Sequence, residues 1–247
     1  NEFYHLAAQS YVDYSFQDEF STLSSNISST HYCLSAIKEI GLNTKFYFAG
    51  SSEMFGKVRE VPQNENTPFY PRSPYGISKV AGFELTRNYR ESYNLHASSG
   101  ILFNHESERR GFEFVTRKIS HAVALIKLKK LKFLELGNLQ AKRDWGYAPE
   151  YVEAMWLMLQ QKKPDDYVVG TGDTKSIKYF VEKAFEVVDL KYEKYVKINK
   201  KFFRPAEVEL LVADSSKIIN KTGWKAKTKI DKLIEKMVIN DLKLLRK

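Results

Sequence analysis

The fold is decided by an aromatic-rich stretch, Lys45-Phe46-Tyr47-Phe48-Ala49-Gly50, which predicts a buried β-strand because such side chains fit a pleated, packed surface. The stretch ends in a polar cluster, Ser51-Ser52-Glu53, followed by a proline-containing loop that runs to Arg72. A helix is then expected from Pro74 to Tyr93, because proline is tolerated in a first helical turn, and a second apolar strand from Ala97 to Phe103. Two strands joined by a helical crossover are expected to pair in parallel.

The alternation of strand and helix continues on both sides. Upstream, residues 2–8 predict a short buried strand, and Asn26 to Ile40 predict an amphipathic helix closed by Gly41. Downstream, we expect a loop at 104–111, a strand at 133–136, and helices at about 114–128, 149–160, 176–188 and 230–245. The whole pattern predicts an α/β fold with a doubly wound parallel sheet. Trp145, Trp156, Met54, Met155 and Met158 are expected to pack inside it.

Composition excludes several function classes. The chain has 247 residues, and its net charge is +9. The lysines spread along the chain and no nucleic-acid-binding motif accompanies them, so we expect no nucleic-acid partner, although the charge suits an anionic nucleotide. No apolar run predicts a membrane span, and the first residues lack the features of a signal peptide. Cys33 is the single cysteine, which favours a reducing cytoplasm, and the five histidines lack metal-ligand spacing.

The clearest chemical signal is the spacing of Tyr75 and Lys79, which places both side chains on one face of the predicted helix. An ammonium near a phenol stabilises the phenolate, so Lys79 is expected to lower the pKa of Tyr75 and let it act as a base. By itself this spacing is common and fits two exposed helix residues. Here Ser51-Ser52-Glu53 adds hydroxyl and carboxylate groups at the end of a strand, where open α/β sheets bind their ligands.

Longer segments resemble the GDP-mannose 4,6-dehydratase family, a branch of the extended short-chain dehydrogenases/reductases, almost from end to end. The segment Asn104-His105-Glu106-Ser107, with Arg109-Arg110-Gly111 shortly after it, is the most specific of them, because related epimerases and other sugar-nucleotide dehydratases do not carry it. The other matching segments are residues 49–56, 68–75, 100–103, 114–119, 136–138, 142–146 and 204–209.

The resemblance implies a Rossmann-like fold that lacks its N-terminal part, with a smaller α/β substrate-binding region. Residues 1–104 would be the remaining part of the dinucleotide-binding domain. Residues 105–247 would be mainly the substrate-binding region, with some segments returning to the Rossmann domain. No Gly-x-x-Gly-x-x-Gly phosphate loop occurs, so we expect a fragment, or a protein whose preceding residues are not included.

The resemblance also implies a redox-neutral loss of water from a GDP-sugar, with NADP as the cofactor and no metal. Tyr75 would take the proton of the C4 hydroxyl while hydride leaves C4, and Lys79 would hold the cofactor ribose. Glu53 would then abstract the C5 proton that the new ketone acidifies, and water would leave C6 with help from Ser51 and Glu53. The product would be a GDP-4-keto-6-deoxy sugar.

Binding positions follow from the same resemblance. The expected cofactor-binding residues are Leu6, Ala7, Ala8, Gln9, Ser10, Tyr75, Lys79, His105 and Arg110. The expected substrate-binding residues are Ser10, Asn104, Lys118, Gly137, Arg143, Arg204 and Glu207. Arg143 and Arg204 would bind the phosphates, because guanidinium groups bind them bidentately. The loop with Arg109 and Arg110 would reach a neighbouring subunit, which implies a dimer or tetramer.

Departures from the family pattern leave alternatives open. Serine stands at 51 where threonine is usual, tyrosine at 11 and 147 where histidine is usual, and glutamate at 108 where proline is usual. The substrate could therefore be GDP-mannose or GDP-manno-heptose. A reductase or epimerase would share Tyr75 and Lys79 but would lack the carboxylate of Glu53. A non-catalytic nucleotide-sugar-binding fragment is the remaining alternative.

Overall fold

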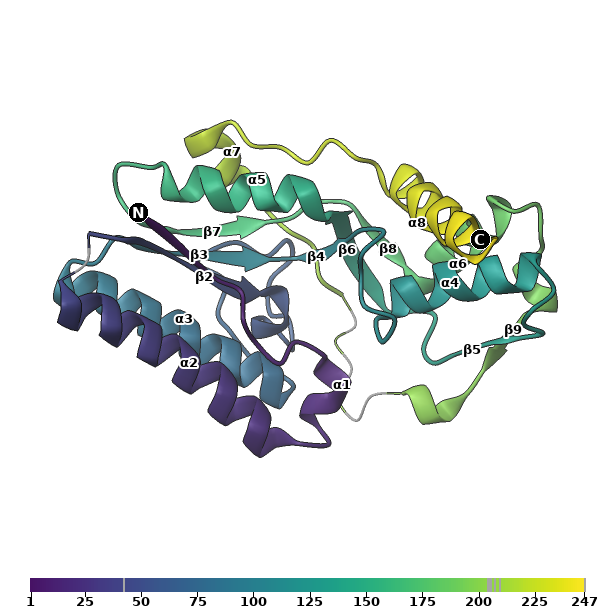
Figure 1. Cartoon of the computed structure of the whole chain (residues 1–247), viewed down its shortest axis with the longest axis horizontal. Helices are drawn as coiled ribbons and strands as arrows, with labels where there is room; N and C mark the ends of the chain where they lie inside the picture. Colours follow the sequence, from purple (N-terminus) through teal and green to yellow (C-terminus); the bar gives the residue numbers. More distant parts are fainter. Residues whose placement is uncertain (42, 204–205, 207, 209, 247) are drawn as a thin grey trace.

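The computed structural model describes residues 1–41, 43–203, 206, 208 and 210–246 (Figure 1). The largest sheet has four parallel strands in the order β1-β2-β3-β7. The strands are β1 (Glu2–His5), β2 (Lys45–Ser51), β3 (Ala97–Leu102) and β7 (Asp166–Val169). Strands β2 and β3 are the predicted pair, and Phe46 lies opposite Ala97 in the register. The strand predicted at 2–8 ends at His5, because the chain then turns along the edge of the site.

Helices cover both faces of this sheet. Helices α2 (Glu19–Ile40) and α3 (Pro74–Tyr93) lie on one face, and α5 (Ala148–Leu159) and α7 (Ser216–Thr222) lie on the other (Figure 1). Alternate side chains of β2 serve the two layers: Phe46 and Phe48 pack in the core under α2 and α3, whereas Tyr47 packs with Met158 of α5. The predicted doubly wound α/β fold is confirmed.

Helix α3 has the predicted bounds because its capping signals are local. Ser73 accepts a hydrogen bond of 3.0 Å from the amide of Gly76, and Asn94 ends the helix in the left-handed conformation. Helix α2, in contrast, begins at Glu19 and not at Asn26, because Asp18 is the N-cap and accepts from the amide of Ser21. The polar residues that resembled a helix start lie within α2, where Thr22, Asn26 and Thr30 are buried.

Beside the four-stranded sheet and its helices lies a second region of the structure, which holds two smaller sheets. One has the order β4-β6-β8 and the other pairs β5 with β9 in parallel. Their strands are β4 (Asn104–Glu106), β5 (Leu134–Leu136), β6 (Lys142–Tyr147), β8 (Thr174–Ser176) and β9 (Val196–Ile198). Helices α4 (Val115–Lys127), α6 (Ile177–Glu186) and α8 (Ile230–Leu245) share an apolar core with these strands. The shorter elements are α1 (Val12–Ser15), η1 (Ser52–Met54), η2 (Tyr192–Lys194) and η3 (Lys200–Phe202).

Several elements differ from the sequence-based expectation. The segment predicted as a loop at 104–111 begins with β4, because its residues pair with Trp145, Gly146 and Tyr147 of β6. Trp145 is buried as expected, but Trp156 is 51% exposed. It lies on the outer side of α5, whereas Met155 and Met158 face the sheet and are buried. Met54 is buried as predicted.

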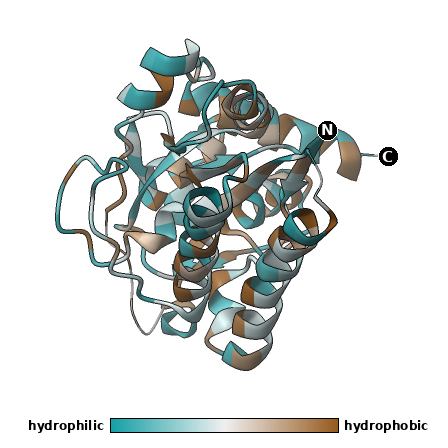
Figure 2. Cartoon of the chain, turned by 90° about the vertical axis from the view of Figure 1, so that its left-hand side faces the viewer, coloured by the Kyte–Doolittle hydropathy of each residue, from teal (hydrophilic) through white to brown (hydrophobic). Residues whose placement is uncertain are grey.

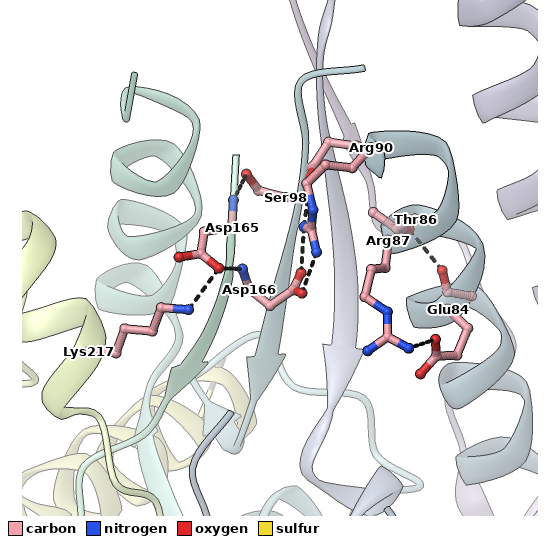
Figure 3. A network of polar contacts seen from close by, with 10 residues as sticks. Glu84, Thr86, Arg87, Arg90, Ser98, Asp165, Asp166 and Lys217 are labelled. Carbon is pink, nitrogen blue, oxygen red and sulfur yellow. Dashed lines mark hydrogen bonds and ion pairs between the residues drawn. The ribbon is translucent and has the colours of Figure 1, made fainter. Parts of the chain in front are cut away.

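A buried ion pair joins α3 to β7 at the amino ends of the sheet strands. Arg90 binds both carboxylate oxygens of Asp166, at 2.8 and 2.6 Å (Figure 3). The neighbouring Asp165 accepts a hydrogen bond of 2.7 Å from Lys217 of α7. Because the strands are parallel, their carboxyl ends meet at the opposite edge, which leaves that edge for a site.

The layer formed by α2 and α3 carries both hydrophilic and hydrophobic residues. Figure 2 looks onto the end of the molecule that carries α2 and α3, and both helices show hydrophilic turns beside hydrophobic ones. Within the described ranges, no helix combines the length and apolar composition that crossing a bilayer requires.

Candidate active site

A cavity of about 470 Å³ opens at the carboxyl ends of the sheet strands, between the four-stranded sheet and the second region. It gathers most of the residues that the sequence predicted. These are Leu6, Ala8, Ser10, Ser51, Glu53, Tyr75, Lys79, Asn104, His105, Arg110, Lys118, Gly137 and Arg143. The segments that supply them lie far apart in the sequence, so the fold alone brings them to one place.

Of the predicted positions that the structure describes, two fall elsewhere. Ala7 and Gln9 do not line the cavity, although Leu6, Ala8 and Ser10 do. The backbone of Gln9 is instead held by Asn26, which accepts from its amide at 2.8 Å and donates to its carbonyl at 3.0 Å. Arg204 and Glu207 lie outside the described residues.

Tyr75 is buried beside Ser51 and Lys79 at the start of α3. Burial raises the pKa of the Tyr75 phenol, a hydrogen bond with the Ser51 hydroxyl and the charge of Arg110 lower it, and the charge of Glu53 raises it. The net shift is upward, and the expected lowering of this pKa by Lys79 stays a prediction. The Lys79 ammonium lies 5.7 Å from the centre of the Tyr75 ring and donates to the carbonyl of Ala49 at 3.0 Å.

Lys79 itself is a perturbed group. Burial lowers its pKa to about 8, because the charged ammonium is poorly solvated there. The amine therefore stays mainly protonated at neutral pH and can donate hydrogen bonds into the cavity. Perturbed titratable groups in a cleft are typical of catalytic sites.

Glu53 is placed by the turn that follows β2. Its amide donates to the Ser51 hydroxyl at 3.2 Å, and this hydrogen bond begins η1. Its carboxylate lies 4.0 Å from the guanidinium of Arg143, whose Nη1 donates to the carbonyls of Val208 and Lys142. A carboxylate, a hydroxyl and a phenol therefore meet at one end of the cavity.

His105 adds a neutral ring to this end. Burial lowers its pKa to about 4, and its Nδ1 donates to the carbonyl of Phe103 at 2.8 Å. The ring stacks on Tyr151 with centroids 4.9 Å apart. At neutral pH the imidazole is therefore uncharged and its orientation is set by packing.

Glu106, Thr116, Phe114 and Arg110 form a group that the sequence did not assign as a unit. Glu106 is 1% exposed, and burial raises its pKa. It accepts from Thr116 at 2.7 Å and pairs with Nε of Arg110 at 3.1 Å. The guanidinium of Arg110 lies 3.5 Å from the centre of the Phe114 ring. The four-residue spacing of Glu106 and Arg110 was the one feature of the sequence that indicated this ion pair. The bend of the chain after β4, which brings the two side chains together, was not predictable.

The far end of the cavity lies against the second region. A side chain at Gly137 would meet the carbonyl oxygen of Phe202 at 2.4 Å, so only glycine fits this close approach. Lys118 lies 3.6 Å above the Phe202 ring, and burial lowers its pKa. Among the described residues, no group of three or more histidine, cysteine, aspartate or glutamate side chains is arranged to hold a metal ion.

The sequence of the chain is similar to those of known proteins. Residues 1–237 match a family model described as GDP-mannose 4,6 dehydratase. A GDP-mannose 4,6 dehydratase of Drosophila melanogaster is 48% identical, with 100% of this chain and 67% of the relative covered. GDP-mannose 4,6 dehydratase 1 of Arabidopsis thaliana is 49% identical, covering 100% of this chain and 69% of the relative. The human GDP-mannose 4,6 dehydratase is 47% identical, covering 99% and 71%.

Solved structures share the fold at lower identity. RMD from Pseudomonas aeruginosa, complexed with NADPH, superposes with a TM-score of 0.90 at 23% identity, over 98% of this chain and 82% of its own. DesIV, a dTDP-glucose 4,6-dehydratase from Streptomyces venezuelae with NAD and TYD bound, has a TM-score of 0.88 at 19% identity, over 97% and 72%.

Proposed function

The chain belongs to the GDP-mannose 4,6-dehydratase family, and from this membership and the geometry of its site we propose that it is a nucleotide-sugar hydro-lyase that converts GDP-mannose to its 4-keto-6-deoxy form. One observation carries the proposal: Glu53 lies in the same cavity as Tyr75, Ser51 and Lys79. With a nicotinamide cofactor as hydride acceptor, a phenol and a lysine supply the acid–base groups for oxidising a hydroxyl, but the elimination of water also needs a group that removes a carbon-bound proton.

The residues around Tyr75 fit a nicotinamide cofactor, and we propose NADP. The small side chains of Ala8 and Ala49, together with Gly50, line the cavity beside Tyr75 and Lys79 and leave room for a flat ring. Leu6, Ala8, Ser10 and Lys79, together with His105 and Arg110, line this cavity and would hold the cofactor. These residues would hold a cofactor that would supply a hydride acceptor for C4 of the sugar and a hydride donor for C6.

Tyr75 acts first in this scheme. Its phenolate form accepts the proton of the C4 hydroxyl, with the Ser51 hydroxyl as a hydrogen-bond partner. Lys79 holds its ammonium near the same ring. Since burial raises the pKa of Tyr75, the protonated residue is a suitable donor of the proton that C5 needs when hydride returns to C6.

Glu53 performs the elimination. Once C4 is a ketone, the hydrogen on C5 is acidic, and the Glu53 carboxylate accepts it. The same group, now protonated, donates to the departing C6 hydroxyl, with Ser51 as a hydrogen-bond partner. One carboxylate that works as base and then as acid accounts for a reaction without a metal.

The second region would bind the GDP-sugar. We propose that residues 1–104 and the returning strand β7 hold the dinucleotide, and that residues 105–247 mainly hold the GDP-sugar. Asn104, Lys118, Gly137 and Arg143 line the cavity on this side, and Arg204 and Glu207 are retained as substrate residues on the family resemblance alone.

We also propose a homo-oligomer, a dimer or a tetramer. Arg109 is exposed on the loop after β4, where a neighbouring subunit could meet it. Arg110, in contrast, turns back onto Glu106 and Phe114 of its own chain.

The substrate prediction is tested by incubating the full-length protein and NADP with GDP-mannose or GDP-manno-heptose and following the products by mass spectrometry. We expect GDP-mannose to lose one water without net oxidation, because the hydride taken from C4 is returned to C6. Faster loss of water from GDP-manno-heptose would instead identify that sugar as the substrate. Binding of both sugars without conversion would identify a non-catalytic binding protein.

A further inference from the structure

A second buried ion pair lies behind the cavity, in the core of the second region. Arg117 of α4 and Asp241 of α8 approach to 2.6 Å, and their side chains are only 5% and 1% exposed. Ser120, one turn along α4, donates to the other carboxylate oxygen of Asp241 at 2.6 Å. Neither ion-pair residue lines the cavity, so contact with a ligand does not explain them.

Arg117 also holds the loop that follows β4. Its Nη1 donates to the carbonyl of Glu108 and lies 3.5 Å from the carbonyl of Arg110. Its guanidinium lies 4.7 Å from the centre of the Phe112 ring, at the other side of the same loop. One arm of the fork therefore binds Asp241 while the other binds the loop backbone, a geometry that guanidinium permits and a lysine ammonium does not.

The loop that Arg117 holds forms part of the cavity wall. Arg110 reaches from it to Glu106 and stacks on Phe114, and both residues line the cavity together with Arg110. The positive charge of Arg110 acts on the Tyr75 phenol. The contacts thus run from α8, through Arg117 and the loop backbone, to Arg110, which lines the same cavity as Tyr75.

We propose that Arg117 and Asp241 are positioning residues, which fix residues 107–111 so that Arg110 stays beside Glu106 in the cavity that also holds Tyr75. The proposal rests on the proposed function for its kinetic consequence, but the anchoring of the loop is a property of the chain itself. A small displacement of a site group is enough to reduce catalysis substantially. The C-terminal helix thereby contributes to catalysis without touching a ligand.

The loop reports its own release, because trypsin cleaves after arginine and Arg109 is exposed in the single chain. The variants and the wild type are compared in the same oligomeric state, checked by light scattering, so that any cover by a neighbouring subunit is equal in all of them. In the full-length protein, Arg117→Lys keeps the charge beside Asp241 but loses the arm on the loop, and Asp241→Asn loses the ion pair. Both variants should be cut after Arg109 or Arg110 at least about tenfold faster under native conditions, because losing a buried charged hydrogen bond favours the open loop to that degree. Mass spectrometry of the fragments identifies the site of cleavage.

The kinetic readout separates positioning from binding. Both variants should lower kcat by about tenfold and leave KM for the GDP-sugar within about threefold, since Arg110 lies at the Tyr75 end of the cavity. Arg90→Lys and Asp166→Asn are the matched controls, because that ion pair is also buried but lies at the opposite edge of the sheet (Figure 3). These controls should lower Tm without changing the loop cleavage rate or kcat.

Unchanged cleavage at the loop, or faster cleavage with unchanged kcat, would overturn the proposal. So would a loss of activity that follows only the loss of folded protein, as in the controls. If the wild-type protein does not convert GDP-mannose, the proposed function fails, and the cleavage rates alone decide whether the loop is anchored. Ser120→Ala, which removes only the hydrogen bond to Asp241, provides the milder variant if Asp241→Asn does not fold.

Discussion

Replacing Tyr75 by phenylalanine should lower kcat at least about a thousandfold, because the proposed acceptor of the C4 proton is lost and general acid–base groups contribute on this scale. The GDP-sugar should still bind with nearly unchanged affinity, since the ring and the cavity remain. Steady-state kinetics together with calorimetric titration of the GDP-sugar would measure both quantities.

Tyr47 on β2 provides a matched control. Tyr47→Phe removes another buried phenol, on β2 and outside the cavity, and should keep kcat within about threefold of the wild type. If Tyr75→Phe turns over within tenfold of the wild type, the assignment of Tyr75 as the proton acceptor is wrong. If both variants lose activity, the loss of a buried phenol affects folding. The kcat values must then be compared per amount of folded protein.

Glu53→Gln should block elimination and leave oxidation. Glutamine keeps the shape of the side chain and its capacity for hydrogen bonding, but it does not take the C5 proton at neutral pH. We expect formation of the 6-deoxy product to fall at least about a hundredfold, in line with the loss of a general base. A 4-keto sugar that retains its C6 hydroxyl should accumulate with reduced cofactor, measurable by absorbance and by mass spectrometry of quenched samples.

Glu65→Gln is the control for this experiment. Glu65 is a carboxylate with a raised pKa, caused by burial, but it lies outside the cavity and accepts a hydrogen bond of 2.7 Å from the amide of Val168. A glutamine oxygen can preserve that bond, so kcat should stay near the wild-type value. A normal rate of 6-deoxy product formation by Glu53→Gln would show that another residue removes the C5 proton.

The fold was predictable where local signals agree with tertiary packing. Helix α3 has its cap at Ser73, proline in its first turn and Asn94 after its last, and all three act within a few residues. Strand β7 was missed because it is only four residues long and its pairing partner β3 lies far upstream. The start of α2 was misplaced because Asn26 resembles a cap but is used inside the helix, where it binds Gln9 and Ser78.

In the candidate site, too, local motifs were informative and long-range contacts were not predictable. The motifs around Ser51 and Tyr75 indicated which residues carry chemistry, and the fold brings them into one cavity. What no motif indicated is the set of long-range contacts that place them. Asn26 reaches Ser78, and Arg117 reaches Asp241 through the packing of α4 against α8. The upward shift in the pKa of Tyr75 was not predictable either, because it depends first on burial.

The central claim is that hydride leaves C4 and returns to C6 of the same sugar while water is lost, with no net oxidation. It is tested most directly by giving the full-length protein and NADP a GDP-mannose that carries deuterium at C4, and locating the label in the product by NMR and mass spectrometry. The account predicts a 4-keto-6-deoxy product with the deuterium at C6. A product without deuterium, or one that keeps its C6 hydroxyl, would contradict it.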